Sequence, residues 1–322
     1  MGKTRERKVR HKMRLSFEDI KKLTVGAVDI EQTEEGIKFY KMQKCQVDAV
    51  YALSDILGFR ALTTTGIRLD FDTDSSYLAF DVKSGTRFEY LIDGEYRGTV
   101  KIGEDKRAVI ELTQSCRVTL VFPSHEVGII DKVELSDGAT ATRHKLERKV
   151  LFIGDSITQG WNSGVDTLSY AWRTSLALNL DSIIQGVGGA YFHESTFADS
   201  GFEPDTVIVA YGTNDVNHFA TKDEMISQLR AYLGKVKETY KNSEIYAISP
   251  IWVSGGREEK RMGNLWECYA LIADEIEKCG VKHIRGLDLV PHEGRYFADE
   301  LHPNKDGFEV YARNLVKIID KR

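Results

Sequence analysis

The stretch that decides the fold is KVLFIGDSITQG, residues 149–160. It begins with a short apolar run over 150–153, and such runs are typical of strands buried on both faces of a parallel sheet. The run ends on Gly-Asp-Ser at 154–156. Open α/β folds carry their chemistry at this edge of the sheet, where Ser156 would have backbone N–H groups beside it, as a nucleophile requires. Taken alone, the same tripeptide is also an ordinary turn followed by a helix N-cap.

The length and composition indicate two domains and a small-molecule partner. At 322 residues, and with roughly 150 residues per domain as a guide, we expect one domain over 1–145 and a second over 146–322. Apolar residues make up 42% of the chain and charged residues 29%, which suffices for sizeable cores. A formal charge of −5 provides no overall attraction to nucleic acid or to an anionic membrane. We therefore expect neither of these as a partner.

The N-terminal segment and the cysteines favour a cytoplasmic protein. Residues 3–12 are basic, but charge returns over 17–22 before any apolar core of signal-peptide length. We interpret 3–12 as a solvated tail rather than as a nucleic-acid-binding arm. The four cysteines are scattered without metal-type pairing. This fits reduced thiols, and we expect neither a metal nor a cofactor.

The first half has the pattern of a β-sandwich. A capping box from Ser16 to Asp19 predicts a short helix, and a second helical piece is expected over 47–53. Asp-Gly at 93–94 predicts a type I′ hairpin turn. Strands are expected over 67–72, 77–82, 88–92, 95–100, 108–112, 117–122 and 127–135. Many short strands at this spacing are typical of a sandwich, and the polar segment 136–145 is expected to be a linker.

From residue 149 onward the pattern alternates between strands and helices. Further parallel strands are expected over 182–185, 206–211, 244–249 and 282–287, and helices over 168–180, 222–240, 264–278 and 305–320. Such alternation predicts a parallel sheet covered by helices on both faces.

Two loops after these strands have the composition of an oxyanion hole. Gly186-Val-Gly-Gly-Ala follows the second strand, and Gly212-Thr-Asn-Asp follows the third. Glycine permits close approach to a ligand and exposes backbone N–H groups, while the side chain of Asn214 offers a directed N–H donor. A phosphate cradle is the alternative, but the loop has neither the Gly-x-Gly-x-x-Gly spacing of a dinucleotide site nor the Lys-Ser/Thr of a P-loop.

Asp299 and His302 precede the last predicted helix and supply the remaining candidate groups. A histidine suits general-base chemistry near neutrality, and a carboxylate three residues earlier can turn back to hold its other ring nitrogen. Each residue alone fits an ordinary turn or helix-capping role. Together with Ser156 they complete a Ser, Asp, His set. His292 is the rival base, but it has no carboxylate three residues before it.

The second half resembles the SGNH, or GDSL, hydrolase superfamily. The four blocks that carry the resemblance are Gly154-Asp-Ser-Ile-Thr, the glycine loop, Gly212-Thr-Asn-Asp and Asp299-Glu-Leu-His-Pro. The resemblance implies that Ser156 is the nucleophile, His302 the base and Asp299 its orienter. It also implies an oxyanion hole formed by the Ser156 amide, the Gly189 amide and the Asn214 side chain. Because Gly188 and Gly189 are adjacent, either of them could supply the loop amide.

The order of the two halves resembles that of two-domain carbohydrate esterases which deacetylate xylan and related glycans. This implies a three-layer α/β/α hydrolase domain with a parallel sheet, preceded by a jelly-roll-like β-sandwich. We therefore expect a serine esterase that removes short acyl groups, chiefly acetyl, from oligosaccharides. The alternatives are a short-chain lipid esterase or thioesterase, and a sugar-binding protein with a vestigial hydrolase domain. Whether the chain forms a homo-oligomer is left open.

Aromatic residues near the predicted loops are candidates for substrate binding, because aromatic rings stack on pyranose faces. Trp161 follows the nucleophile loop, Tyr191 follows the glycine loop, and Trp252 follows the fourth parallel strand. Trp252 is an equally good candidate for a packing residue.

Overall fold

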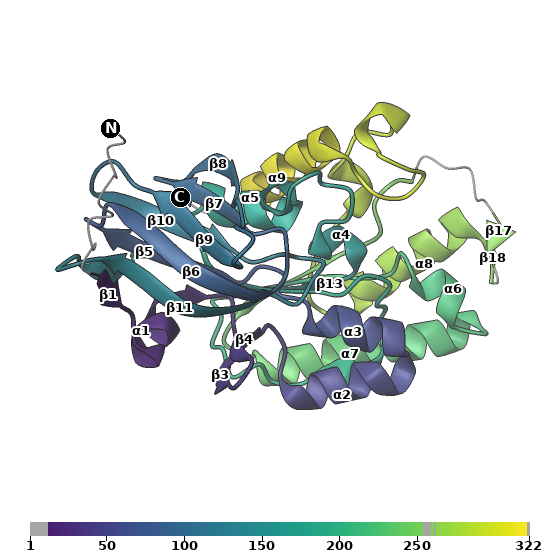
Figure 1. Cartoon of the computed structure of the whole chain (residues 1–322). Coiled ribbons are helices and arrows are strands. Elements are labelled where there is room, and N and C mark those ends of the chain that lie inside the picture. Colours follow the sequence, from purple (N-terminus) through teal and green to yellow (C-terminus); the bar gives the residue numbers. More distant parts are fainter. Residues whose placement is uncertain (1–11, 254–258, 261, 321–322) are drawn as a thin grey trace, which may run out of the picture.

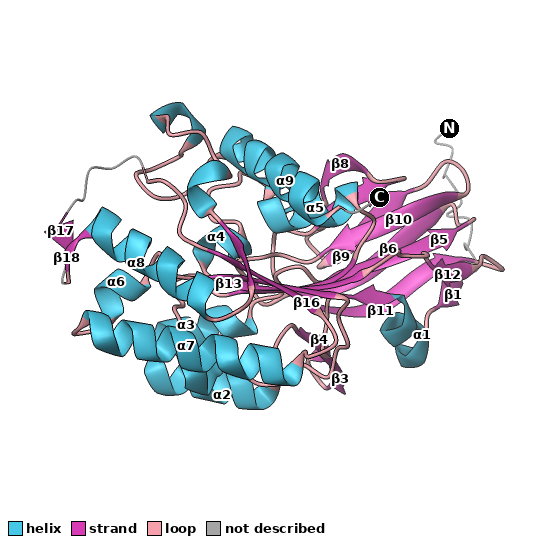
Figure 2. Ribbon diagram, turned by 180° about the vertical axis from the view of Figure 1, so that it is seen from behind, coloured by secondary structure: helices cyan, strands magenta, loops and turns pink. Residues whose placement is uncertain are grey.

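The computed structural model describes residues 12–253, 259–260 and 262–320. It has three sheets of five or six strands, two antiparallel in the first half and one parallel in the second (Figures 1 and 2). This confirms the predicted fold class, a mixed α/β chain in which an antiparallel, β-rich part is followed along the sequence by a parallel sheet. Among the described residues, no helix is long and apolar enough to cross a membrane.

The two antiparallel sheets enclose an apolar core of their own. One sheet has the order β3-β4-β11-β6-β9, with β1 paired to β11, and the other has the order β12-β5-β10-β7-β8, with β2 paired to β5. The strands of the first sheet are β1 (Lys12–Arg14), β3 (Asp29–Thr33), β4 (Gly36–Tyr40), β6 (Tyr77–Ser84), β9 (Arg107–Glu111) and β11 (Ile129–Ser136). Those of the second are β2 (Thr24–Val25), β5 (Arg68–Thr73), β7 (Glu89–Ile92), β8 (Glu95–Thr99), β10 (Cys116–Val121) and β12 (Ala141–Arg143).

Local signals account for several of these elements. Helix α1 (Phe17–Leu23) begins at the capping box formed by Ser16 and Asp19. The β7–β8 hairpin turns at Asp93 and Gly94, which both have positive φ, as a type I′ turn requires. The linker predicted over 136–145 is wrong in part, because β12 lies within it and pairs with β5. Its polar composition is that of a short edge strand.

Two helices interrupt the antiparallel part between β4 and β5. They are α2 (Lys44–Leu53), which was predicted in part, and α3 (Asp55–Leu62), which was not. Their buried side chains Val47, Val50 and Leu57 pack against Val187 in the loop after β14. The insertion therefore reaches the second half of the chain, on the same side of the parallel sheet as α7 in both views (Figures 1 and 2).

The parallel sheet has the order β14-β13-β15-β16-β19. Its strands are β13 (Lys149–Gly154), β14 (Asp181–Gly186), β15 (Thr206–Ala210), β16 (Glu244–Ile248) and β19 (Lys282–Ile284). Val150 and Phe152 of β13 face α5 (Tyr170–Ala177) and α9 (Lys305–Ile319), while Leu151 and Ile153 face α7 (Lys222–Thr239) and α8 (Leu265–Lys278). An uninterrupted apolar strand is needed here because both of its faces are buried.

The remaining elements are short. They are α4 (Ser156–Gln159), α6 (Asp215–His218), the pair β17 (Glu259–Lys260) and β18 (Gly263–Asn264), and the 3₁₀ turns Asp166–Leu168, Glu194–Thr196, Gly286–Asp288 and Gly294–Tyr296. The first parallel strand, β13, lies between the second and the third. The chain therefore reverses its direction of winding at β13 and β15, and ligands bind at such switch points.

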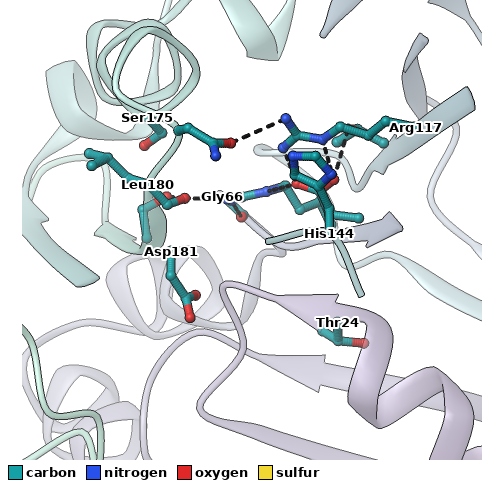
Figure 3. Close-up of polar contacts among 12 residues, drawn as sticks. Thr24, Gly66, Arg117, His144, Ser175, Leu180 and Asp181 are labelled. Carbon is teal, nitrogen blue, oxygen red and sulfur yellow. Dashed lines mark hydrogen bonds and ion pairs between the residues drawn. The ribbon is translucent and has the colours of Figure 1, made fainter. Parts of the chain in front are cut away.

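Buried charges join the two halves (Figure 3). Arg117 of β10 donates to both oxygens of Asp70 at 2.7 Å and to Asn179 Oδ1 at 3.2 Å. Arg68 of β5 donates to the Leu180 carbonyl at 2.8 Å. Burial opposes ionisation of Asp70, but the bonds and charges of Arg117 and Arg68 outweigh it, so the pKa of Asp70 is lowered. This contact between the two halves, the charged seam, is therefore built from the side chains Arg68 and Asp70 of β5 and Arg117 of β10 and from Asn179 and Leu180, which precede β14.

Candidate active site

Ser156 is the first residue of α4 and lies at the switch point between β13 and β15. The turn before it is tight: a Cβ on Gly154 would lie 2.1 Å from Thr158 Oγ1 and 2.8 Å from the Ala210 carbonyl. Only glycine fits there. Asp155 caps α4, since its Oδ1 accepts the Ile157 N–H at 2.9 Å. The Gly-Asp-Ser tripeptide is thus a strand end, a cap and a helix start, with the Ser156 hydroxyl at the carboxyl edge of the sheet.

Ser156, His302 and Asp299 form one hydrogen-bonded chain. His302 Nε2 lies 2.9 Å from Ser156 Oγ, and His302 Nδ1 lies 2.9 Å from Asp299 Oδ2. Because a carboxylate can only accept, Nδ1 carries the proton and Nε2 is left to accept from the serine hydroxyl. The structure thus brings together three residues that are up to 146 positions apart in the chain.

Asp299 is held by the turn that it begins. Its Oδ1 accepts the backbone N–H groups of Leu301 at 2.7 Å and of His302 at 2.6 Å. The Asn162 side chain donates to Oδ2 at 2.8 Å. Burial opposes ionisation, but the hydrogen bonds from the backbone and ring of His302 outweigh it, so the pKa of Asp299 is lowered. Asp299 is therefore an ionised acceptor fixed in position beside the imidazole.

The glycine loop after β14 is held from two sides. Gly188 N–H donates to Gln159 Oε1 at 2.7 Å, and the Gly188 carbonyl accepts from Arg60 Nη1 at 2.7 Å. Gly189 has a φ of +87°, and a Cβ there would lie 3.1 Å from Leu57 Cδ2 and 3.2 Å from Arg60 Nη1. The N–H of Gly188 is thus engaged, whereas that of Gly189 has no hydrogen-bond partner among the described residues.

Asn214 follows β15, beside the glycine loop. Its Nδ2 donates to the Ala190 carbonyl at 3.0 Å and lies 3.4 Å from Asp155 Oδ2. Burial raises the pKa of Asp155 to about 7, and it does the same for Asp215, whose Oδ1 accepts the Phe192 N–H at 3.0 Å. These buried carboxyls support the loops that flank Ser156 rather than reaching a ligand themselves.

Two cavities border this constellation. The larger, of about 750 Å³, has walls from both halves of the chain, and its lining residues include Ile56, Phe59, Arg60, His125, Trp161 and Asn162. The smaller, of about 410 Å³, is lined among others by Asn214, Leu265, Tyr269 and His302. Helix α3 presents Ile56 and Phe59 to the larger cavity with 64% and 51% of their surface exposed. The antiparallel half therefore forms one wall of the larger cavity, which also includes Asn162 and Trp161, the neighbours of Asp299 and His302.

Of the three aromatic residues predicted to bind substrate, only Trp161 lines one of the two cavities. Trp161 lines the larger cavity and stacks on the His302 ring with 6.0 Å between the centroids. Tyr191 stacks on His218 at 4.0 Å, and Trp252 stacks on His292 at 5.6 Å. Neither Tyr191 nor Trp252 is among the described residues that line the two cavities. The rival base His292 binds the Leu287 carbonyl at 2.9 Å, whereas His302 contacts Ser156.

Sequence reasoning missed two residues that hold the site. Gln159 is 1% exposed, and it donates to the Ser124 carbonyl at 2.8 Å besides accepting from Gly188. Its position one helical turn after Ser156 was the available signal, because the two residues share a face of α4. Arg60 carried no signal, since the helix that presents it was not predicted and its partner is a backbone carbonyl 128 residues away.

Residues 152–310 match the model of the GDSL-like lipase/acylhydrolase family. The second half of the chain carries a GDSL-like hydrolase domain. The predicted resemblance is thereby confirmed, and with it the enzyme class, an ester hydrolase of the SGNH type. The GDSL-like domain includes Ser156, Gly189, Asn214, Asp299 and His302, and the matched range begins after β12, the last strand of the two large antiparallel sheets.

Solved structures resemble the chain over almost its whole length, while no curated protein matches it. A salicylyl-acyltransferase from a tetracycline biosynthetic pathway, SsfX3, has a TM-score of 0.76 and 18% identity, covering 95% of this chain and 96% of that one. A GDSL-like lipase from Bacteroides ovatus has a TM-score of 0.72 and 16% identity, covering 97% of both chains. The acetyl xylan esterase Est2A from Butyrivibrio proteoclasticus has a TM-score of 0.65 and 14% identity, covering 97% and 98%. At these identities the likeness establishes a shared fold that includes the antiparallel part.

Proposed function

We propose that the chain is a serine esterase that removes short acyl groups, chiefly acetyl, from oligosaccharides. The observation that carries the proposal is the chain of two 2.9 Å contacts from Ser156 through His302 to Asp299. In this mechanism His302 takes the hydroxyl proton while Ser156 attacks the ester carbonyl. His302 then protonates the leaving alcohol, and water cleaves the acyl-enzyme with His302 as base again.

The negative charge that develops on the carbonyl oxygen would be met by three donors, the N–H groups of Ser156 and Gly189 and the side chain of Asn214. Two observations favour Gly189 over Gly188. The Gly188 N–H is engaged by Gln159 at 2.7 Å, and the left-handed conformation of Gly189 is one that other residues rarely adopt. Asn214 has a second N–H besides the one bound to Ala190, and its 3.4 Å contact with Asp155 is long for a hydrogen bond.

An acetylated sugar suits the cavities beside Ser156. The larger cavity combines an indole ring, an exposed phenyl ring and polar groups, which is the mixture that binds the apolar faces and hydroxyls of a pyranose. Of the three aromatic residues predicted to bind substrate, Trp161 is the one that lines this cavity. The shared fold with an acetyl xylan esterase supports the same substrate class. A cytoplasmic location would favour short sugars over polymers as substrates.

Acetate release from a panel of acetylated xylo-, manno- and gluco-oligosaccharides tests the proposal, with Ser156→Ala as the control. We expect release from at least one sugar by the parent protein and none above background by the variant. Labelling of Ser156 by a fluorophosphonate probe is the second arm. Glycan binding without labelling would instead identify a sugar-binding protein with a vestigial hydrolase domain, and preference for acyl thioesters or lipid esters would identify the other alternative.

Acyl transfer is a second candidate, favoured by the whole-length fold similarity to a salicylyl-acyltransferase. The two reactions share the acyl-enzyme and differ only in whether water or an alcohol attacks it. Product analysis with a sugar or polyol acceptor present distinguishes them. Hydrolysis yields free acid at a rate independent of the acceptor, whereas transfer yields a new ester.

A further inference from the structure

The contacts between α3 and the glycine loop point to a role for the antiparallel half in the reaction itself. Arg60 Nη1 donates to the Gly188 carbonyl at 2.7 Å. That carbonyl and the Gly189 N–H belong to the same peptide group, which is planar and trans, so the two bonds point in opposite directions. Fixing the carbonyl toward α3 therefore fixes the Gly189 N–H toward the other side of the loop. We propose that Arg60 is a positioning residue that orients and polarises the Gly189 N–H for the oxyanion. This inference rests on the proposed function.

The peptide group is held tightly enough for such a role. On its other flank, the Gly188 N–H is bound by Gln159 at 2.7 Å, so both peptide groups of Gly188 are fixed. Gly189 itself lies against α3, since a Cβ there would come within 3.2 Å of the Arg60 guanidinium. Oxyanion donors act through preorganisation, and a peptide plane that is free to rotate loses this advantage.

Arg60 is itself held in place. Its guanidinium lies over the Trp161 ring at 4.9 Å, and its backbone carbonyl accepts from the buried Lys41 Nζ at 2.9 Å. Lys41 also donates to Thr63 Oγ1 at 2.8 Å and to Thr65 Oγ1 at 3.1 Å. Through these contacts the end of α3 is tied to the start of the next segment of the antiparallel half. The backbone of Arg60 is therefore anchored, and its guanidinium is held between the Trp161 ring and the Gly188 carbonyl.

The charge of Arg60 adds to its geometric effect. A cationic donor on the carbonyl makes the hydrogen bond charge-assisted, and hydrogen bonds in series polarise one another. The Gly189 N–H at the opposite end of the same peptide group then becomes a stronger donor. The stabilisation grows as charge develops on the substrate oxygen, so it acts on the transition state more than on the bound substrate. The expected signature is a change in kcat with little change in KM.

The test is steady-state kinetics of Arg60→Ala and Arg60→Lys on p-nitrophenyl acetate. We expect kcat of Arg60→Ala to fall by about tenfold to 100-fold, less than the loss of a whole oxyanion donor, with KM changed by less than about threefold. Arg60→Lys keeps the charge without the rigid fork and should lie in between. Arg97→Ala is the matched control, because it removes another arginine, one that pairs with Glu95 on the β8 hairpin and, within the described part of the chain, contacts none of the site residues named above. Thermal unfolding of each variant shows whether it is folded.

Chemical rescue separates positioning from a merely structural role. Guanidinium chloride at concentrations below those that unfold the protein should restore part of the kcat of Arg60→Ala, and should not restore Asn214→Ala, whose missing donor has another shape. Parent-like kcat in a folded Arg60→Ala, with Ser156→Ala inactive, would overturn the role of Arg60 and leave the esterase proposal intact. A loss of kcat in Arg60→Ala that guanidinium does not partly restore would also overturn the role of Arg60. Activity that is independent of Ser156 would overturn the proposed function.

Discussion

The side-chain amide of Asn162 donates a 2.8 Å hydrogen bond to Asp299 Oδ2, the same oxygen that accepts the hydrogen bond from His302 Nδ1. Asn162 has a φ of +65°, a conformation that asparagine and glycine tolerate better than other residues. This residue therefore combines a left-handed loop conformation with a contact to Asp299, the proposed orienter of the base His302.

Removing that amide should slow the reaction without disturbing the loop. Asn162→Gly keeps the left-handed conformation and should lower kcat/KM on p-nitrophenyl acetate by about tenfold, as expected for one hydrogen bond to a charged group. Asn162→Asp has nearly the same shape but places a second carboxylate beside Asp299, so its loss should be larger. Parent-like activity of both variants would show that the contact is unimportant.

Truncating the proposed nucleophile and the proposed oxyanion side chain should have unequal effects. Ser156→Ala should leave no esterase activity above background. Asn214→Ala should retain some activity, because loss of one oxyanion donor typically costs on the order of 100-fold to 1,000-fold in turnover. Both variants are assayed on p-nitrophenyl acetate. Parent-like activity of Ser156→Ala would exclude Ser156 as the nucleophile.

The buried cap Asp155 should make stability fall as pH rises. An unfolded aspartate has a pKa of about 3.9, whereas burial raises the pKa of Asp155 to about 7. Between these values the folded protein holds a proton that the unfolded chain has lost, so the free energy of unfolding decreases as pH rises. Asp155→Asn keeps the acceptor for Ile157 and does not titrate. Urea unfolding at about pH 5 and about pH 8 should show a smaller decrease in the variant than in the parent; equal decreases would refute this account.

The charged seam between the halves should contribute to stability above acidic pH. Arg117→Gln leaves the buried Asp70 carboxylate with fewer partners, and we expect a loss of about 3 kcal/mol in the free energy of unfolding near neutrality. The pKa of Asp70 is lowered in the folded protein, so its contribution is present above the unfolded pKa and is lost as pH falls. The difference between parent and variant should therefore shrink in acid. Lys44→Gln, which breaks the exposed pair with Asp48, should cost less than about 0.5 kcal/mol.

The parallel half could be predicted because its signals are local. The run over 150–153 is apolar throughout because its side chains alternate between two buried faces. Ser156, Asn214 and His302 could be grouped because parallel strands bring the loops after them to one edge. In the other half, α3 was missed because Ile56 and Phe59 are exposed and line a cavity instead of joining a core, which breaks the one-faced helical pattern of buried apolar residues.

Other features depend on contacts that no local pattern contains. The choice between Gly188 and Gly189 depends on which N–H a distant glutamine side chain occupies. The strand β12 is three residues long and polar, so only its pairing with β5 reveals it. The contact of Arg60 depends on a helix inserted between β4 and β5, which belong to the two different antiparallel sheets.

Helix α3 lines the larger cavity without belonging to the GDSL-like domain, so the cavity wall and the residues around Ser156 can change independently in evolution. Ile56 and Phe59 line the larger cavity but belong to a helix outside the GDSL-like domain. Substitutions at these two positions can alter the width and polarity of the cavity while Ser156, Asn214 and His302 stay as they are. On the proposed function, substrate range would diverge through one surface helix, and a mutant library restricted to residues 56 and 59 would sample new specificities while the proposed catalytic residues stay unchanged.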